Sequence, residues 1–488
     1  MKKIIRIARV EVLSLFYMPV AWLILIAFII QTGTDFFTEA YRYGVGNSLG
    51  YLVHDFITYH LFYDRYVGLF TLLKTKLIYY IPLLTMGVIS KEISSGSIKL
   101  LLSSPVKISE FVLGKFFGVA IFNLFFIAVL MIYGIISLFV VENMDWPAVL
   151  SGLLGIYLLI CTYAAVGVFV SSLTSYQAVA ALLTLAILFS MNNISIVWQN
   201  YDFFRDLTYN LSLSGRIEVF ISGLITTRDV IYYLMMITAF LGLTMMRLSF
   251  NRQMMPFSAR LPRYALLILA VAGIGYISGR PKLIGYWDVT ANQGQSLSPQ
   301  GQEIMKKFKQ PVEVTTYVNL LEENYNRFKP QIRNGDLLNL EPYRRFHRDM
   351  EFNYVNYYDT TPRSWQINAN YGMSIPDIAK KVAKAEGKSL DYYLSPKEIR
   401  KKIDLSSVEN RIIREFKMGN RRATIMGTFL GELPEEKEML VPFKMLLGSE
   451  PKVLGFVQGH NERELDAPRG LKMLTSDIEG KKSLCNNG

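Results

Sequence analysis

Long apolar runs occupy the first 280 residues of the chain, whereas residues 281–488 have the mixed pattern of an ordinary soluble domain. A helix needs about 20 mostly apolar residues to cross a bilayer. Runs near that length predict seven membrane spans, and the last is short. The predicted spans are 17–32, 68–90, 116–140, 148–170, 178–197, 229–248 and 264–279. The pattern therefore predicts a mixed fold: an all-α polytopic membrane bundle of six spans plus a seventh tethering span, followed by an α/β domain.

Polar residues between the second and third spans predict a structured loop. Hydrocarbon cannot hold the charged side chains of 91–115 at modest cost, so this segment is expected outside the bilayer. Its charged residues are Lys91, Glu92, Lys99, Lys107, Glu110 and Lys115. Within it, Ile98 and Leu100–Leu102 form a short apolar piece that Pro105 ends. A small structured element beside the membrane is typical of a docking surface for a soluble partner.

Basic residues predict which side of the membrane each loop faces. Lys and Arg are frequent in 1–16, 91–115 and 247–263 and infrequent in 31–67. Because basic loops stay in the cytoplasm, the N-terminus is predicted to be cytoplasmic. Seven spans then place residues 281–488 outside the cytoplasm, in a multi-pass protein of the inner (cytoplasmic) membrane with a periplasmic domain.

The N-terminal residues 1–16 have a pattern of their own. Apolar residues recur at helical spacing, and basic residues interrupt them. This predicts an amphipathic helix lying in the membrane surface. The alternative is an extended first transmembrane helix. A signal peptide is not favoured, because no small-residue cleavage pattern follows the run from Val20 to Ile30.

The outer half predicts alternating helices and strands. Ser298 followed by Pro299 is typical of a helix start, and the β-branched run 312–318 predicts a strand. Further predicted strands are 351–357, 407–416, 422–430 and 452–457, further predicted helices are 337–349, 397–402 and 437–447, and 361–400 is predicted to be partly loop. This alternation predicts an α/β layer structure.

Histidines in two places have both a functional and a structural interpretation. His460 follows a predicted strand and precedes Glu462, which fits a ligand or metal site at a strand end, but a solvated turn is the simpler interpretation. His54 and His60 flank Asp55 in the first outer loop. A metal site is one interpretation there, and a half-buried loop rich in aromatic residues is the favoured one.

Composition narrows the function further. The net charge is +12, but much of the basic excess lies in short loops beside apolar spans. This placement indicates membrane orientation and argues against nucleic-acid binding. The two cysteines, Cys161 in a span and Cys485 near the end, predict neither a disulfide nor a metal cluster. The sequence has no Gly-x-x-x-x-Gly-Lys-Ser/Thr phosphate loop, so ATP hydrolysis is expected in a separate polypeptide.

Two segments resemble the ABC-2-type permease family, the membrane subunits of one class of ATP-driven transporter. The family's interfacial helix, with its Glu and aromatic-Pro start of the first span, resembles ARVEVLSLFYMPVAW. The family's second-loop motif resembles KEISSGSIKLLLSSPV, and a Gly-Lys pair follows as Gly114–Lys115. The matching residues are Glu11, Phe16 and Pro19 in the first segment, and Glu92, Gly96, Ser97, Leu100–Leu102 and Pro105 in the second.

The resemblance implies a transport subunit and not an enzyme. It implies a cytoplasmic ABC ATPase as partner, with ATP and Mg bound by that partner and no cofactor on this chain. A homodimer or paired permease, surrounding membrane lipid and export are also implied. The expected ATPase-coupling residues are Glu92, Gly96, Ser97, Ile98, Leu101 and Pro105. Glu92 is expected to offer a charge-assisted contact, Gly96 to let the backbone turn, and Ile98 with the leucines to fill an apolar cleft.

The start of the outer half resembles the auxiliary component of gliding-motility-type ABC transporters, a membrane-tethered extracytoplasmic domain. The matching residues are Trp287, Asp288, Thr290, Leu297, Ser298 and Pro299 near the start, and Gly459, His460 and Glu462 further on. Gly301 stands in the region where the family commonly has Thr. The family's domain continues further and ends in another span, so this outer domain is expected to be incomplete at its C-terminus.

These observations predict an organisation in consecutive segments. An ABC-2-type permease domain with an interfacial helix is expected at 1–250, a cytoplasmic linker and seventh span at 251–280, and an α/β extracytoplasmic auxiliary domain at 281–488. The alternative function is a membrane-anchored extracytoplasmic scaffold or sensor without transport activity. A membrane enzyme, such as a glycosyltransferase, is disfavoured because no acidic or histidine clusters converge in the sequence.

Overall fold

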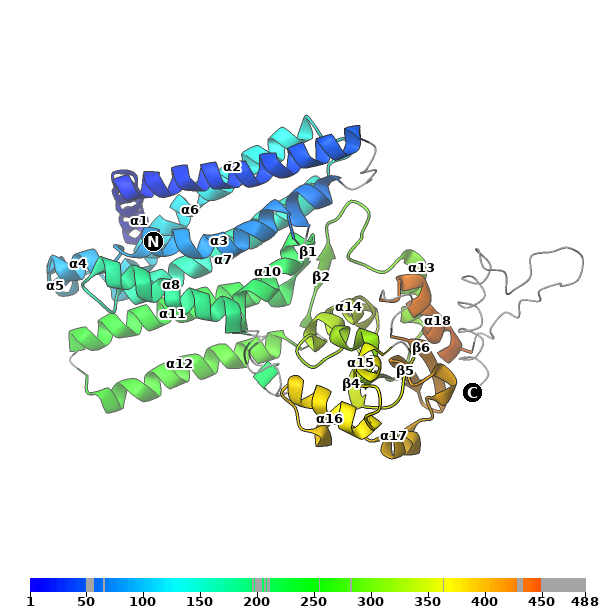
Figure 1. Ribbon diagram of the computed structural model, residues 1–488. Helices are drawn as coiled ribbons and strands as arrows, with labels where there is room; N and C mark the ends of the chain where they lie inside the picture. The colour runs from blue at the N-terminus through cyan, green and yellow to red at the C-terminus, as the bar shows by residue number, and fades with distance from the viewer. Residues whose placement is uncertain are drawn as a thin grey trace, which may run out of the picture. The chain divides into compact units, whose positions relative to one another are not determined.

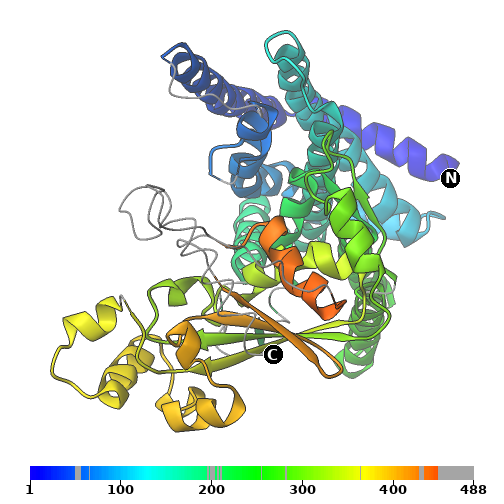
Figure 2. The ribbon, with the colours of Figure 1, turned by 90° about the vertical axis from the view of Figure 1, so that its right-hand side faces the viewer.

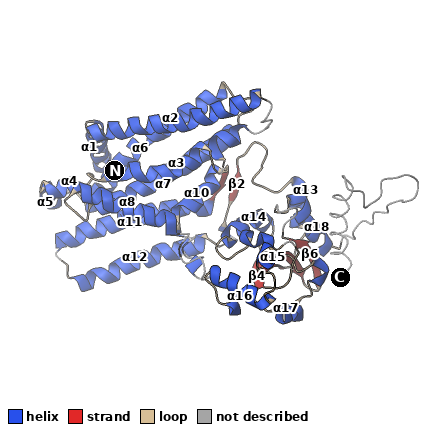
Figure 3. Ribbon diagram, viewed as in Figure 1, coloured by secondary structure: helices blue, strands red, loops and turns tan. Residues whose placement is uncertain are grey.

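The computed structural model describes residues 1–49, 57–64, 66–194, 197, 204–205, 208, 211–253, 255–280, 283–362, 364–427 and 433–448. The chain forms two compact units. Unit 1 comprises Met1–Val197 and Asp206–Gln295, and unit 2 comprises Trp198–Arg205 and Ser296–Gly488. Helices make up nearly all of unit 1, whereas the larger sheet lies in unit 2 (Figure 3).

Unit 1 is a helical bundle (Figure 1). Its helices are α1 (Lys2–Phe16), α2 (Pro19–Ser48), the π-helical turn η1 (Tyr59–Tyr63), α3 (Leu69–Thr85), α4 (Ser90–Ser94), α5 (Ser97–Ser103), α6 (Ile108–Leu138), α7 (Trp146–Ser171), α8 (Gln177–Asn193), α10 (Leu213–Ile221), α11 (Thr227–Gln253) and α12 (Phe257–Ser278). Six described segments are long and apolar enough to cross a membrane: Pro19–Ser48, Leu69–Ser94, Ile108–Leu138, Trp146–Ser171, Thr227–Gln253 and Ser258–Ser278. The fifth predicted span corresponds to the shorter apolar helix α8, of 17 residues. The predicted helical membrane bundle followed by an α/β domain is confirmed.

Helix α7 lies at the centre of unit 1 and packs against α3, α6, α8, α10 and α11. Glycines on its surface let these neighbours approach closely. A Cβ atom at Gly152 would lie 2.4 Å from the Phe70 ring, and one at Gly167 would lie 2.0 Å from Oγ1 of Thr85. Because lipid is as apolar as leucine, close packing of this kind stabilises helix association in a membrane.

Two lysines within α3 have acidic partners on other helices. Lys76 Nζ lies 2.5 Å from Oδ2 of Asp35 on α2, and Lys74 Nζ lies 2.5 Å from Oε1 of Glu218 on α10. A charge in a membrane helix is costly unless it is paired or reaches water. These ion pairs account for the lysines in an otherwise apolar span.

The predicted outer loops of unit 1 meet at one end of the bundle. Strand β1 (Leu224–Thr226), before α11, pairs antiparallel with β2 (Tyr286–Asp288), after α12. The carboxylate of Asp145, in the turn between α6 and α7, accepts hydrogen bonds from the backbone N–H groups of Ala148 and Ala291. Helices α4 and α5 lie at the opposite end of the bundle (Figure 1). The predicted outer segments therefore share one end of unit 1.

Unit 2 contains a four-stranded sheet with strand order β4-β3-β5-β6, in which β3 and β4 are parallel and the other neighbours antiparallel. The strands are β3 (Val312–Asn319), β4 (Met350–Tyr357), β5 (Ile413–Met418) and β6 (Arg421–Met426). The helices are α13 (Pro299–Lys306), η4 (Glu323–Arg327), α14 (Arg333–Phe346), α15 (Trp365–Ala369), α16 (Ile375–Ala385), η5 (Leu390–Tyr392), α17 (Pro396–Lys402), η6 (Ser406–Val408) and α18 (Glu436–Leu446). The predicted strands at 312–318 and 351–357 are confirmed.

The prediction was less accurate for 361–416. The strand predicted at 407–416 begins only at Ile413, because a 3-10 turn and the left-handed residues Glu409 (φ 55°) and Asn410 (φ 53°) precede it. The polar segment 361–400 also contains α15 and α16, whose N-caps are Ser364 and Ser374. The predicted strand 452–457 lies outside the described residues.

Helices α13, α14 and α18 cover one face of the unit 2 sheet, and Figure 2 shows α18 in orange beside the strands. Phe443 of α18 packs edge-on against Phe416 of β5 at 4.9 Å between ring centroids and stacks on Tyr343 of α14 at 5.5 Å. A buried ion pair between Asp336 and Arg414 also ties α14 to β5. Unit 2 therefore has an apolar core of its own.

Acid is expected to weaken unit 2 through His347. This side chain is 7% exposed, and burial lowers the pKa of His347 below its usual value of 6.5. His347 therefore binds a proton more readily in the unfolded chain than in the folded chain. The contribution of neutral His347 to the free energy of unfolding is complete above the pKa that it has in the unfolded chain, and it is lost as the pH falls toward the lower pKa of the folded chain. We expect the protease resistance of unit 2, measured in the full chain, to fall as the pH drops below the usual histidine pKa of 6.5. A His347→Gln variant should lose part of this pH dependence. The control, His60→Gln in unit 1, should keep it. If protease resistance changed with pH in the His347 variant as it does in the parent chain, His347 would not be the cause.

Candidate functional site

The predicted loop element consists of two short helices, α4 and α5, joined at Gly96. Gly96 has φ +73°, in the left-handed region that glycine adopts without steric cost. A Cβ atom there would meet nothing within 4 Å, so backbone conformation and not space favours glycine. The Oγ atom of Ser97, the first residue of α5, donates a hydrogen bond to the Glu92 carbonyl at 3.3 Å. We call α4, α5 and the residues between them the α4–α5 element.

Ser171, at the end of α7, holds the start of this element. Its Oγ accepts hydrogen bonds from the backbone N–H groups of Ile89 (3.0 Å) and Ser90 (2.9 Å) and donates one to the Met86 carbonyl (3.0 Å). These groups lie at the junction of α3 and α4, where the backbone lacks regular helical partners. The element therefore leaves the bundle in a direction that α7 determines.

The side chains of the element differ in what they face. Ile98 is partly buried and packs, like Ile93, against the apolar core of unit 1. Leu100 is 76% exposed. The side chain of Leu101 lies outside the described part of the structure. Pro105 is exposed, and its carbonyl accepts a hydrogen bond from Nζ of Lys3 on α1 at 3.1 Å.

A three-residue ion cluster joins the element to α1 and α6. Nζ of Lys115, on the first turns of α6, lies 2.6 Å from Oε2 of Glu11 on α1 and 2.5 Å from Oε1 of Glu92 on α4. Glu11 is only 6% exposed. The second oxygen of Glu92, Oε2, is buried without a hydrogen-bond partner among the described residues. We call Glu11, Glu92 and Lys115 the Lys115 cluster.

The environment of Glu11 makes this cluster sensitive to the loss of its cation. Burial raises the pKa of Glu11, while the positive charge of Lys115 acts in the opposite direction. A buried carboxylate without a partner is strongly destabilising. The charged form of Glu11 therefore depends on Lys115.

Helix α1 packs directly on α6 through a pair of glycines. A Cβ atom at Gly114 would lie 2.6 Å from Cβ of Ile7, and one at Gly118 would lie 2.5 Å from Cβ of Glu11. Small residues four positions apart permit this approach between membrane helices. The close packing brings Glu11 to Lys115.

The remaining residues of the N-terminal motif connect α1 to α2. The ring of Phe16 lies 5.1 Å from that of Phe125 and 5.5 Å from that of Phe122, and the Phe16 carbonyl accepts a hydrogen bond from Nε1 of Trp22. Pro19 is the first residue of α2. Since α1 ends at Phe16 and α2 begins at Pro19, the alternative of one extended first helix is wrong.

The predicted outer-domain motif falls into separate places. The Asp288 carboxylate accepts hydrogen bonds from the backbone N–H and Oγ1 of Thr290 and from the backbone N–H of Gln295, so it orders the loop after β2 in unit 1. In unit 2, Ser298 caps α13 by accepting from the Gly301 N–H, and Pro299 is the first helical residue. The other predicted motif residues, Gly459, His460 and Glu462, lie outside the described residues.

Sequence reasoning missed two residues that position the element. Lys115 was noted as a loop charge and within a Gly-Lys pair, and its acidic partners were not predicted, because a lysine at the end of a span can also reach the membrane interface. Ser171 follows a long apolar run, and nothing in the local sequence distinguishes it from other serines at helix ends. Both act through contacts with residues distant in the chain.

Comparison with known families identifies one related family. Residues 77–255 match the family model of the ABC-2 family transporter proteins. This match supports an ABC-2-type permease. The matched segment contains the α4–α5 element, Ser171 and Lys115, while Glu11 precedes it and residues 296–488 of unit 2 follow it. Among curated proteins, no match to the chain was found.

Proposed function

We propose that the chain is the membrane subunit of an ABC-2-type exporter that a separate cytoplasmic ATPase drives. The α4–α5 element docks on that ATPase, which binds the ATP and Mg. The observation that carries the proposal is the Lys115 cluster, because it connects the exposed element to α1 and α6 through buried charges. The family match over residues 77–255 supports the same class of protein.

The geometry changes the roles proposed for two residues of the element. Glu92 pairs with Lys115 inside the chain, so it orients the element instead of reaching toward the ATPase. Ile98 packs inward, and the exposed Leu100 takes its place as the apolar contact offered to the ATPase. Gly96 and Ser97 shape the turn that presents Leu100.

Movement then passes through the Lys115 cluster. Closure of the ATPase dimer displaces the α4–α5 element, and Lys115 transmits the displacement to the start of α6 and to α1. Rigid helices that are packed as closely as α1 and α6 move together, which rocks the bundle between two arrangements. Two permease copies, or a pair of different permeases, complete the pathway, and unit 2 acts as the fused auxiliary domain of the gliding-motility type.

The orientation belongs to the same proposal: the N-terminus and the α4–α5 element face the cytoplasm, and residues 281–488 lie outside the inner membrane. The segments predicted to be outside share one end of unit 1, which supports it. Basic residues near α1 and in the 91–115 loop favour the cytoplasm for the other end.

Thiol labelling tests this orientation and, with it, the access of a cytoplasmic ATPase. In a background lacking Cys161 and Cys485, a Lys99→Cys variant should react with a membrane-impermeant maleimide in inverted vesicles and not in intact cells. A Glu303→Cys variant, at an exposed position of unit 2, is the control and should show the opposite pattern. Labelling of the Lys99 variant from outside intact cells would overturn the proposed orientation and the docking site.

A further inference from the structure

A cavity of about 570 Å³ lies at the end of unit 1 where β1 and β2 pair. Figure 1 shows that this end is opposite the α4–α5 element. Ligand sites commonly have volumes of about 300–1,000 Å³. Four separate segments line the cavity: the η1 region, the turn between α6 and α7, Ser222, and the loop after β2. The lining is thus assembled from loops that the bundle brings together.

The charge of the lining is negative. Its charged residues include the carboxylates Glu142 and Asp145, and among the described residues that line it there is neither lysine nor arginine. A cleft with charge of one sign concentrates ligands of the opposite sign. The described residues contain no group of three or more His, Cys, Asp or Glu side chains that could hold a metal ion. The lining therefore suits an organic cation better than an anion or a metal.

Aromatic side chains add a second basis for binding a cation. Tyr59 and Tyr63 line the cavity from the η1 turn, with ring centroids 5.3 Å apart and planes at 89°. The face of a tyrosine ring attracts an ammonium group, more strongly where water is excluded. Burial raises the pKa of the Tyr63 hydroxyl, with a smaller contribution from Asp145, so the hydroxyl stays protonated and can donate.

Asp145 is held in place before any ligand binds. Its Oδ1 accepts from the Ala148 N–H, its Oδ2 accepts from the Ala291 N–H, and its own N–H donates to Oγ1 of Thr58. These bonds connect three of the lining segments. A preformed carboxylate of this kind reduces the entropic cost of binding.

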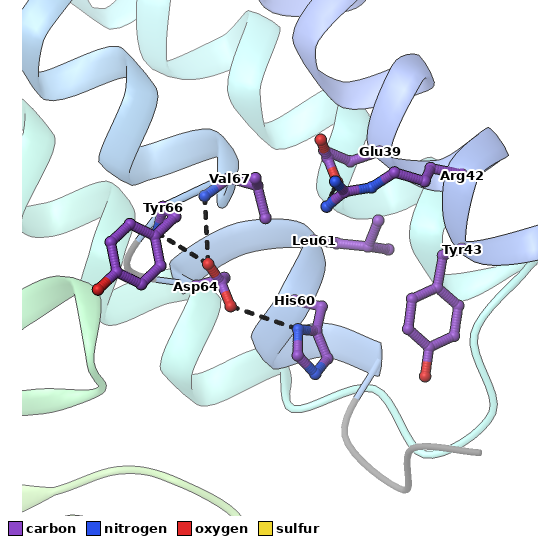
Figure 4. A pocket seen from close by; sticks show the side chains of 8 residues that line it. All are labelled: Glu39, Arg42, Tyr43, His60, Leu61, Asp64, Tyr66 and Val67. Carbon is purple, nitrogen blue, oxygen red and sulfur yellow. Dashed lines mark hydrogen bonds and ion pairs between the residues drawn. The ribbon is translucent and has the colours of Figure 1, made fainter. Parts of the chain in front are cut away.

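A neighbouring cavity has a different charge and serves as an internal comparison. This cavity, of about 470 Å³, shares His60 with the first and is lined also by Glu39, Arg42 and Asp64 (Figure 4). Arg42 lies 2.6 Å from Glu39, and Nδ1 of His60 lies 3.4 Å from Asp64. The lining of this second cavity carries both signs of charge, so we expect it to bind cations less well than the first cavity does.

We propose that the cavity between η1, the α6–α7 turn and the loop after β2 is a binding site for an organic cation that carries protonated amines. Glu142 and Asp145 supply the negative charge, and Tyr59 and Tyr63 supply the aromatic faces. The site does not depend on the proposed transport function, because binding requires only this chain.

Titration calorimetry on the purified full chain tests the site with spermidine as the probe. We expect saturable binding of spermidine and none of glucose or inorganic phosphate at the same concentrations. Glu142→Gln and Tyr59→Leu should each raise Kd by about three- to fivefold, near the upper end of the range for exposed charge and cation–π contacts. Both side chains are exposed, so these changes leave the packing of unit 1 intact. Glu39→Gln, in the neighbouring cavity, is the matched control and should leave Kd within about twofold.

Three outcomes would overturn the proposal. They are an absence of spermidine binding, spermidine binding that both cavity variants leave unchanged, and binding of glucose in place of spermidine. Thermal unfolding of each variant should match that of the parent chain. Spermidine binding lost only in variants that also unfold earlier would likewise count against a specific site.

Discussion

In the proposed transporter, replacing Glu92 with arginine is expected to uncouple the chain from the cytoplasmic ATPase. The change places a second cation beside Lys115, where Glu92 Oε1 now lies 2.5 Å away. Removing one partner of a buried ion pair destabilises the folded arrangement by about 3–5 kcal/mol, and the partial exposure of Glu92 reduces this figure. The α4–α5 element would then no longer be held in the orientation that docks on the ATPase. A tenfold loss of affinity requires only about 1.4 kcal/mol. The ATPase that co-purifies with the tagged chain, and transport driven by it, should therefore each fall by at least about tenfold.

The matched control for this variant is Glu303→Arg. It makes the same change of charge at an exposed position of unit 2, and we expect co-purification to remain at the parental level. Glu92→Gln, which keeps a hydrogen-bond acceptor but removes the charge, should fall between the two. If the Glu92→Arg variant retained full co-purification and full transport, the docking role of the α4–α5 element would be wrong.

Replacing Lys115 with methionine is expected to produce the largest loss of stability in unit 1. The change leaves Glu11, which is 6% exposed, without its cation, and it also frees Glu92. The free energy of unfolding should fall by about 3–5 kcal/mol, the range for a buried ion pair that loses one partner. Thermal unfolding of the detergent-solubilised chain measures this fall, and α1 should become accessible to protease first.

Three further variants separate charge from packing. Lys107→Met removes an exposed lysine just before α6 and should change stability by less than about 0.5 kcal/mol. Adding Glu11→Gln to Lys115→Met should restore part of the loss, because the buried charge is then gone. Gly118→Ala should detach α1 without altering any charge, since its Cβ would lie 2.5 Å from that of Glu11. Equal stability of the Lys115 and Lys107 variants would contradict the importance of the cluster.

The helices of unit 1 were largely predictable, because crossing a bilayer imposes long apolar runs that any folded arrangement must keep. The break between α1 and α2 was also readable, since basic residues interrupt the first helix and proline begins the second. In unit 2 the strands β3 and β4 were predicted from alternation and β-branched residues. The helices α15 and α16 were not, because short polar helices with serine caps resemble loops in composition.

The residues of the candidate site divide in the same way. Gly96 could be predicted as a turn, since a left-handed φ is a local property that glycine satisfies by itself. The inward position of Ile98 could not be predicted, because it depends on the core that α4 and α5 happen to cover. The ion pair of Glu92 with Lys115 could not be predicted either, because it depends on how α4 and α6 pack.

The sequence by itself determined the fold class of this protein, the approximate positions of its long apolar helices and which of its loops are rich in basic residues. These properties follow from hydrophobicity, charge and backbone preference, which act residue by residue along the chain. Only the tertiary structure decided that Lys115 meets Glu11, 104 positions away, that Lys76 meets Asp35, and that four loops enclose one acidic cavity. Ion pairs and cavities depend on distances through space, and those distances exist only after the helices have packed.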